Sequence, residues 1–250
     1  MIKENIFSHN FNLVNYTTIK VGGIAEYFAE PVNAQEFIKL IEWSKFNNKK
    51  CQIIGAGSNL LINNIFLEGL TICTKKMRSI EIDSNTGIVE AEAGVMLPNL
   101  SNLLAKNGLE GGEWAIGIPG TVGGAICMNA GSRNLSLANN LISVKVINTK
   151  TLETLEIERK DIIFKYRFSS FQDNNLIIIS VKLQFKPKGN IQKLIEKTKN
   201  NLKLKTEKQP YHLPSFGSVF KNPENKFAAK LIEETGLKGF KIGDAEISTM

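Results

Sequence analysis

The residues most suggestive of chemistry surround Ser218, in the stretch PSFGSVFKNP. A serine close to Lys221 and Asn222 can be a nucleophile, a proton donor or an ordinary turn residue. A nucleophilic serine needs a base and a sharp strand-to-helix turn, but its neighbours read FGSVF rather than GxSxG, and His9 and His212 are the only histidines. Serine hydrolysis is therefore the weakest hypothesis, while proton donation and a structural turn stay open.

A first glycine-rich loop follows a short apolar stretch at 51–54. It consists of Gly55, Ala56, Gly57, Ser58 and Asn59. The dinucleotide-binding fingerprint would need a third glycine at position 60, where Leu60 stands, and an acidic residue about twenty positions on, near Lys75 and Lys76. We therefore reject that βαβ fold. The two glycines still allow backbone N–H groups to approach phosphate oxygens closely, and a plain structural turn is the alternative.

A second loop, GIPGTVGGA, carries four glycines. Its candidate ligand contacts are Gly117, Ile118, Pro119, Gly120, Thr121, Gly123, Gly124 and Ala125. Such a run costs conformational entropy and supplies little core packing, so close backbone approach to a bulky flat or phosphorylated ligand explains it better than structure alone. Two such loops in one domain predict a large ligand such as a dinucleotide.

The composition is that of a globular protein with a basic excess. The chain has 250 residues, of which 42% are hydrophobic and 22% charged, and a formal net charge of +7. Much of the excess lies in the lysine-rich stretch 193–208. We interpret this stretch as a solvated helix face rather than a field for anionic ligands or nucleic acid, because no nucleic-acid module or stacking platform accompanies it.

The cysteines and the apolar segments indicate the compartment. Cys51, Cys73 and Cys127 form no CxxC pair, so we expect no metal site and no disulfide framework, as suits a reducing environment. The N-terminus has no apolar core of signal-peptide length. The uncharged stretch 114–132 is interrupted by five glycines and Pro119. We expect a cytoplasmic monomer that does not insert into membranes and binds no nucleic acid.

The elements that position these loops mix helix and strand. A helix is predicted to begin at Asn33, with Glu36 reaching back to the cap, and a second to run from Pro98 to Lys106. Strands are predicted at 51–54, 142–147 and 177–185, and a C-terminal helix at 227–235. A long helix from 191 is predicted to bury Ile191, Leu194, Ile195 and Leu202 and to hold its lysines on the other face. A domain boundary is predicted near Gln209, and the class is α+β or mixed α/β.

Six segments occur in the order found in one bacterial cell-wall family. They are NYTTIKVGG (15–23), GAGSNLL (55–61), GIPGTVGGA with NAG (117–125 and 129–131), YRFS (166–169), GSVFKNP (217–223) and LIEETGLKG (231–239). Together they resemble UDP-N-acetylenolpyruvoylglucosamine reductases, from residue 15 to the last residue. GIPGTVGGA and GSVFKNP are specific to that family, whereas GAGSN alone is not.

The resemblance implies a fold and a domain division. Residues 1–208 would form an FAD-binding region of the vanillyl-alcohol-oxidase or PCMH type, made of two α+β subdomains. Residues 209–250 would form the start of a smaller α+β substrate-binding domain. The fold class expected is therefore α+β.

The resemblance also implies roles for the site residues. Non-covalent FAD would lie with its pyrophosphate against 55–59 and its flavin near 117–125, and would be reduced by NADPH. The enolpyruvyl ether of UDP-N-acetylglucosamine would then receive hydride. Arg167 would stabilise the enolate and Ser218 would protonate it, roles that suit a planar guanidinium and a nearby hydroxyl. Tyr166, Lys221 and Asn222 would contact the UDP-sugar. A surface Arg167 paired with an aspartate is the structural alternative.

Residues around these groups are expected to have lesser roles. Tyr16 and Trp114 would pack near FAD. Lys208, Gln209 and Tyr211, on the segment that leads into the serine block, would be secondary substrate contacts, although solvation alone also explains Lys208.

The sequence departs from the family at its C-terminal end. The chain ends at GDAEISTM, before the position of a downstream catalytic glutamate of the family, and Glu246 does not take that place. We therefore expect this form to bind FAD but to turn over poorly. No long insertion falls between 177 and 191, which predicts the shorter subtype. The alternatives are another PCMH-type FAD oxidoreductase and a non-catalytic basic binding protein.

Overall fold

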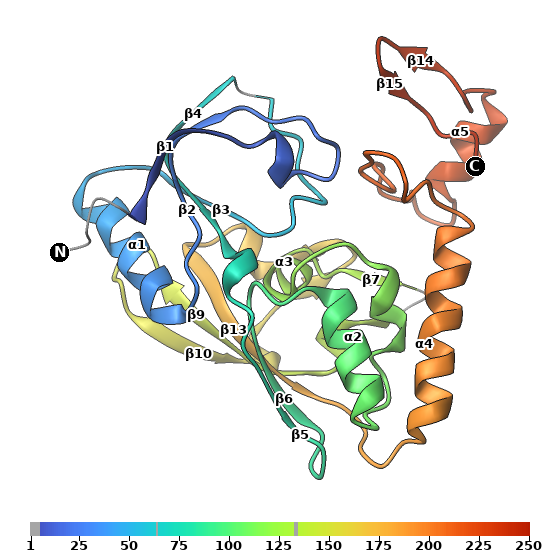
Figure 1. Ribbon diagram of the computed structural model, residues 1–250, viewed down its shortest axis with the longest axis horizontal. Coiled ribbons are helices and arrows are strands. Elements are labelled where there is room, and N and C mark those ends of the chain that lie inside the picture. Colours follow the sequence, from blue (N-terminus) through green and yellow to red (C-terminus); the bar gives the residue numbers. More distant parts are fainter. Residues whose placement is uncertain (1–5, 64, 133–134) are drawn as a thin grey trace.

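A four-stranded mixed sheet forms one layer of the computed structural model, which describes residues 6–63, 65–132 and 135–250 (Figure 1). In spatial order its strands are β1 (Ser8–Asn12), β2 (Ile24–Ala29), β4 (Phe66–Cys73) and β3 (Cys51–Ile54). β1 is antiparallel to β2, whereas β2, β4 and β3 are parallel. Parallel strands end on the same edge, so the segments after Ile54 and after Cys73 lie together. The predicted strand at 51–54 is confirmed as β3.

A five-stranded antiparallel sheet forms the second layer. In spatial order its strands are β10 (Thr154–Glu158), β9 (Leu141–Asn148), β13 (Leu176–Gln184), β6 (Ile88–Glu92) and β5 (Ile80–Asp83). The predicted strands at 142–147 and 177–185 are confirmed as β9 and β13. Alternation along β13 buries Val181 and Leu183 completely, and Phe185 just beyond it.

Short hairpins and 3-10 turns complete the backbone. The hairpins pair β7 (Gly131–Ser132) with β8 (Leu135–Ser136), β11 (Phe164–Lys165) with β12 (Phe168–Ser169), and β14 (Lys241–Ile242) with β15 (Ala245–Glu246). The 3-10 turns are η2 (Val14–Tyr16), η3 (Thr74–Lys76), η4 (Glu113–Gly117), η5 (Leu137–Asn139), η6 (Arg159–Asp161) and η7 (Ser170–Gln172).

Three of the five described helices begin at a residue whose side chain accepts one of the first N–H groups. The five helices are α1 (Ala34–Phe46), α2 (Leu97–Lys106), α3 (Val122–Cys127), α4 (Ile191–Thr206) and α5 (Ala228–Glu234). Asn33, Thr121 and Asn190 accept the cap hydrogen bonds of α1, α3 and α4. The prediction for Glu36 was wrong in one detail, because its carboxylate accepts the N–H of Val32, one residue before the cap.

The two sheets share a hydrophobic core beneath α1. Phe37, Leu40 and Ile41 of α1 pack with Ile72 of the first sheet and Ile147 of the second. A larger core joins the second sheet to α2 and α3, and buries residues such as Leu100, Val122 and Ile126. Because α3 lies in this second core, the glycine loop that begins it is attached to the second sheet, whereas the 55–59 loop is attached to the first.

α4 runs beside α2 along one flank of the molecule, and the chain from 209 onward lies past its C-terminal end (Figure 1). The predicted apolar face of α4 is only partly correct. Leu194 is buried, but Ile191 and Leu202 are exposed, and Thr198 takes a buried place instead. In the described ranges, no helix has the length and apolar character needed to cross a membrane.

Candidate functional site

The two predicted glycine loops touch one another although they belong to different sheets. A Cβ atom added to Gly55 would lie 2.4 Å from Thr121 Oγ1, so the backbone of one loop lies against the side chain of the other. Gly57 has a φ of +67°, and a Cβ there would lie 1.9 Å from the carbonyl oxygen of Tyr16. Glycine is therefore required at position 57, and at position 55 a larger residue would displace the Thr121 side chain.

Backbone donors in both loops are free to receive an anion. Across the described ranges, no hydrogen bond involves the N–H groups of residues 56–59, or those of Gly120 and Thr121. The face of Gly120 is open, because an added Cβ would meet only Ser58 Oγ at 3.6 Å and a Leu97 methyl at 4.0 Å. Clustered unpaired N–H groups beside an open glycine face fit a phosphate-bearing planar cofactor such as FAD.

Arg167 occupies a strained position at the tip of the β11–β12 hairpin. Its φ is +56°, a left-handed conformation that L-residues other than Asn and Asp seldom adopt. Its guanidinium lies over the Tyr166 ring, 5.4 Å from the centroid. Gln172 Nε2 donates to the carbonyl oxygens of Arg167 (3.3 Å) and Cys127 (2.8 Å), and Ser169 Oγ also donates to Cys127 (2.7 Å). The hairpin is thus fixed to the end of α3, the helix that the second glycine loop begins.

The segment 211–222 contacts each of the predicted sites. The Tyr211 hydroxyl donates to the carbonyl oxygen of Gly117. Thr18 Oγ1 donates to the Ser215 carbonyl (2.7 Å), and the Ser215 N–H donates to the Thr18 carbonyl (3.1 Å). The Thr18 N–H donates in turn to the carbonyl oxygen of Gly57 (3.2 Å).

A third tie reaches the arginine hairpin. The Asn222 N–H donates to the Tyr166 hydroxyl at 3.3 Å, and Asn222 Oδ1 accepts the N–H of Ala228 at the start of α5. The two sequence-predicted substrate residues Tyr166 and Asn222 are therefore brought together, from positions far apart in the chain.

The structure does not pair every predicted residue. Ser218 and Lys221 are exposed, and within the described ranges no hydrogen bond or ion pair involves either of them. Ser218 follows Gly217, whose φ is +65° and whose N–H donates to Ser215 Oγ. The position of Ser218 is thus set by the backbone of the preceding turn, and Ser218 lies three residues after Ser215, which Thr18 holds. Thr18 was not predicted as a site residue, although it lies in the NYTTIKVGG segment.

Burial raises the pKa values of the titratable groups nearest the loops. Burial first, and then the Glu30 carboxylate that accepts its hydrogen bond, raise the pKa of Tyr16 to about 12. Burial raises the pKa of the Cys73 thiol to about 11 and also raises that of Cys127. Tyr16 therefore stays neutral and the thiols stay protonated near neutral pH, so these groups pack rather than react. Within the described residues, no cluster of His, Cys, Asp and Glu could hold a metal ion.

The family model "FAD binding domain" matches residues 25–155, more than half of the chain. Alkyldihydroxyacetonephosphate synthase has a similar fold, with a TM-score of 0.52 and 16% identity over 67% of this chain and 35% of that one. The protein has the PCMH-type FAD-binding fold, and FAD is its cofactor.

The particular family follows from three further matches. The model "UDP-N-acetylenolpyruvoylglucosamine reductase, C-terminal domain" matches residues 209–250. The reductase of that name from Prochlorococcus marinus subsp. pastoris is 73% identical over all of this chain and 84% of the relative. The crystal structure of UDP-N-acetylenolpyruvylglucosamine reductase from Thermus caldophilus is 29% identical, with a TM-score of 0.80 over 95% of this chain and 83% of that one.

The chain belongs to the UDP-N-acetylenolpyruvoylglucosamine reductase family. It is an FAD-dependent oxidoreductase, as the sequence predicted. Both alternatives, a flavoenzyme of another family and a non-catalytic basic binding protein, were wrong.

Proposed function

We propose that this chain reduces the enolpyruvyl ether of UDP-N-acetylglucosamine to UDP-N-acetylmuramate with NADPH, a step of peptidoglycan precursor synthesis. The observation that carries the proposal is the triple contact of segment 211–222 with Gly57 through Thr18, with Gly117, and with Tyr166. These hydrogen bonds gather the phosphate-type loop, the second glycine loop and the arginine hairpin around one short segment that contains Ser218.

The two glycine loops would hold the cofactor. The free N–H groups of 56–59 would bind its pyrophosphate, and the open backbone at Gly120 would admit its flavin. Bound FAD supplies the hydride chemistry of the reaction.

Arg167 and Ser218 would handle charge and proton. Addition of hydride to the terminal vinyl carbon moves the double-bond electrons to the neighbouring carbon and its carboxylate. The Arg167 guanidinium would hold that negative charge, and the Ser218 hydroxyl would transfer its proton to the neighbouring carbon, completing the lactyl ether. Because Ser218 is exposed, the substrate itself must exclude water from it.

The remaining assignments follow from position. Tyr166, Lys221 and Asn222 would bind the UDP-sugar, and the boundary between the FAD-binding region and the substrate-binding domain would fall at 208/209. Supporting this boundary, α4 ends at Thr206 and the C-terminal family model begins at 209. The three cysteines are free, which supports a reducing compartment and hence the cytoplasm.

The half-reactions test the proton donor directly. Under nitrogen, NADPH should reduce the FAD bound to Ser218→Ala at a rate within about twofold of the parent. Reoxidation of that FAD by the enolpyruvyl substrate should slow by roughly 10²–10⁴-fold. Ser218→Cys keeps a proton on a similar side chain and should retain part of the second rate. Equal slowing of both halves in Ser218→Ala would show that Ser218 is not the proton donor.

A further inference from the structure

One face of α4 contacts both ends of the turn η4. Lys197, Asn201 and Lys205 are spaced four residues apart and so lie along one side of the helix. Asn201 Nδ2 donates to the carbonyl oxygen of Glu113, the first residue of η4, at 3.1 Å. At the other end, a Cβ added to Gly117 would lie 2.8 Å from Lys205 Cγ, so the lysine stem packs directly on that glycine.

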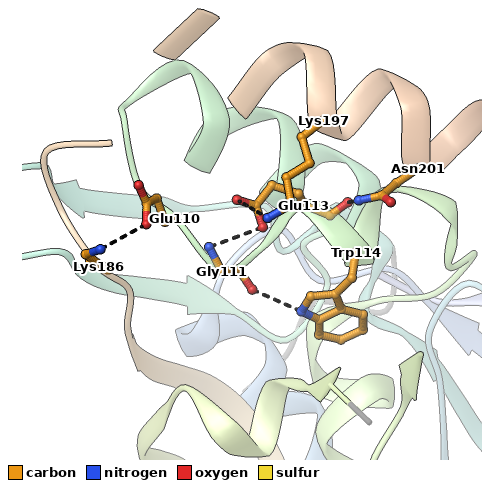
Figure 2. A network of polar contacts seen from close by, with 7 residues as sticks. All are labelled: Glu110, Gly111, Glu113, Trp114, Lys186, Lys197 and Asn201. Carbon is orange, nitrogen blue, oxygen red and sulfur yellow. Dashed lines mark hydrogen bonds and ion pairs between the residues drawn. The ribbon is translucent and has the colours of Figure 1, made fainter. Parts of the chain in front are cut away.

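The Glu113 carboxylate in this contact is unusual because it is a buried charged group (Figure 2). Glu113 is only 4% exposed. Its Oε2 accepts the N–H of Gly111 at 3.3 Å, and Lys197 Nζ lies 3.5 Å from Oε1. In the described part of the chain, Oε1 has an ion partner but no well-aligned hydrogen bond. The same turn is closed by the Trp114 indole N–H, which donates to the Gly111 carbonyl at 3.0 Å.

A buried carboxylate with an incomplete set of hydrogen bonds is a poor source of stability. Removing the Glu113 carboxylate from water costs several kcal/mol by continuum estimates, and the exposed Lys197 ammonium offsets only part of this, so an apolar residue of similar volume often stabilises as well or better. Ordinary packing of η4 against α4 would therefore not need Glu113. The carboxylate instead fixes the orientation of η4, because it must face both the Gly111 N–H and the Lys197 ammonium.

We propose that Glu113, held by Lys197, is a positioning residue for the flavin. η4 ends at Gly117, where the loop assigned above to FAD begins, so a change in the angle of η4 moves that loop. This inference rests on the proposed role of the loop. The pair therefore acts on the cofactor through the backbone of residues 117–121, without touching it.

A neighbouring ion pair provides the matched control. Lys186 Nζ lies 3.3 Å from Glu110 Oε2, three residues before Glu113 (Figure 2). These side chains are 77% and 40% exposed. The pair joins the residues just after β13 to the chain just before η4, and it does not contact the loop that follows η4. Neutralising it changes the net charge of the protein as much as neutralising the Glu113 pair does.

The experiment measures FAD binding to the apoprotein by flavin fluorescence quenching, together with the visible circular dichroism of bound flavin. Glu113→Gln and Lys197→Met should each weaken binding roughly tenfold, about 1.4 kcal/mol, and alter the flavin dichroism. The double variant should weaken binding no more than either single one. Lys197→Arg, which keeps the cation, and the controls Glu110→Gln and Lys186→Met should stay within about twofold.

The outcomes separate this inference from the function proposed above. Unchanged affinity and dichroism in Lys197→Met, or changes no larger than those of the controls, would overturn the positioning role. Lys197 is 65% exposed, so its substitution leaves no cavity and tests the proposal even if Glu113→Gln fails to fold. Normal FAD binding by Gly120→Ala would refute the loop assignment itself. Weak binding by Gly120→Ala with normal binding by Lys197→Met would refute only the role of Glu113.

Discussion

Replacing Arg167 with glycine should separate the stability of this protein from its activity. Arg167 holds a φ of +56° at the tip of the β11–β12 hairpin. An L-residue in the left-handed region costs roughly 1–2 kcal/mol, and glycine avoids that cost but adds about 0.5–1 kcal/mol of unfolded-state entropy. Loss of the cation–π contact with Tyr166 removes a further ~0.5–1 kcal/mol at an exposed site. These contributions nearly cancel, so Arg167→Gly should leave the free energy of unfolding within about 1 kcal/mol of the parent.

The catalytic effect of the same substitution should be large. If the guanidinium holds the charge that forms on the substrate, its loss should slow reoxidation of reduced FAD by the enolpyruvyl substrate by about 10²–10³-fold. Reduction by NADPH should change by less than about twofold, because the charge forms only in the second half-reaction. Arg167→Ala keeps the positive φ, so it should lose the same activity and be about 0.5–1 kcal/mol less stable than the glycine variant.

Urea unfolding of the holoprotein and anaerobic stopped-flow measurements provide both quantities. Retention of reoxidation within about threefold in Arg167→Gly would show that the guanidinium has no role in charge stabilisation. A loss of more than ~2 kcal/mol in stability would instead show that the hairpin depends on the arginine side chain, and that its backbone is not strained. If Arg167 has a structural role, the large loss of stability is expected. If it has the proposed catalytic role, neither retained reoxidation nor a large loss of stability is expected.

Three further predictions concern the loops and their anchor. Gly120→Ala should stabilise the apoprotein by about 0.4–1 kcal/mol, because its open face accepts a methyl group, yet weaken FAD binding at least roughly tenfold by filling the cradle; calorimetry of both steps measures this. Thr18→Val loses one hydrogen bond to Ser215, about 1 kcal/mol, and should slow only flavin reoxidation, by about fivefold, in the stopped-flow assay. Because the pKa of Tyr16 is raised to about 12, the stability that it confers is complete below its unfolded pKa of about 10 and is lost as the pH rises toward 12. Urea midpoints should therefore fall more between about pH 10 and 12 in the parent than in Tyr16→Phe, and equal falls would contradict this.

The sequence predicted those parts of the site that depend on local signals. The strand at 51–54 and the loop after it were identified because apolar residues and closely spaced glycines lie next to each other in the chain. The cap at Asn33 was identified for the same reason, since its partner lies three residues away. The PCMH-type fold came from motif order rather than from periodicity.

Long-range contacts left no comparable signal. Thr18 and Ser215 pair across 197 positions, and neither residue type is unusual in its neighbourhood. The burial of Glu113 depends on where α4 crosses η4, which no local pattern encodes. The predicted burial of Leu202 failed for a related reason: α4 packs along a narrow stripe against α2 and η4, so only part of its apolar spacing is covered.

The contacts around segment 211–222 close into a ring that joins the two sheets. From Gly57 the ring passes to Thr18, then to Ser215, along the chain to Tyr211, and across to Gly117. It closes where the two glycine loops touch. Because each loop is held from two directions, loss of one hydrogen bond leaves the other path intact, and the loops keep their separation. This is why Thr18→Val is expected to affect the segment that carries Ser218 more than the cofactor cradle, and why its predicted effect is fivefold rather than complete.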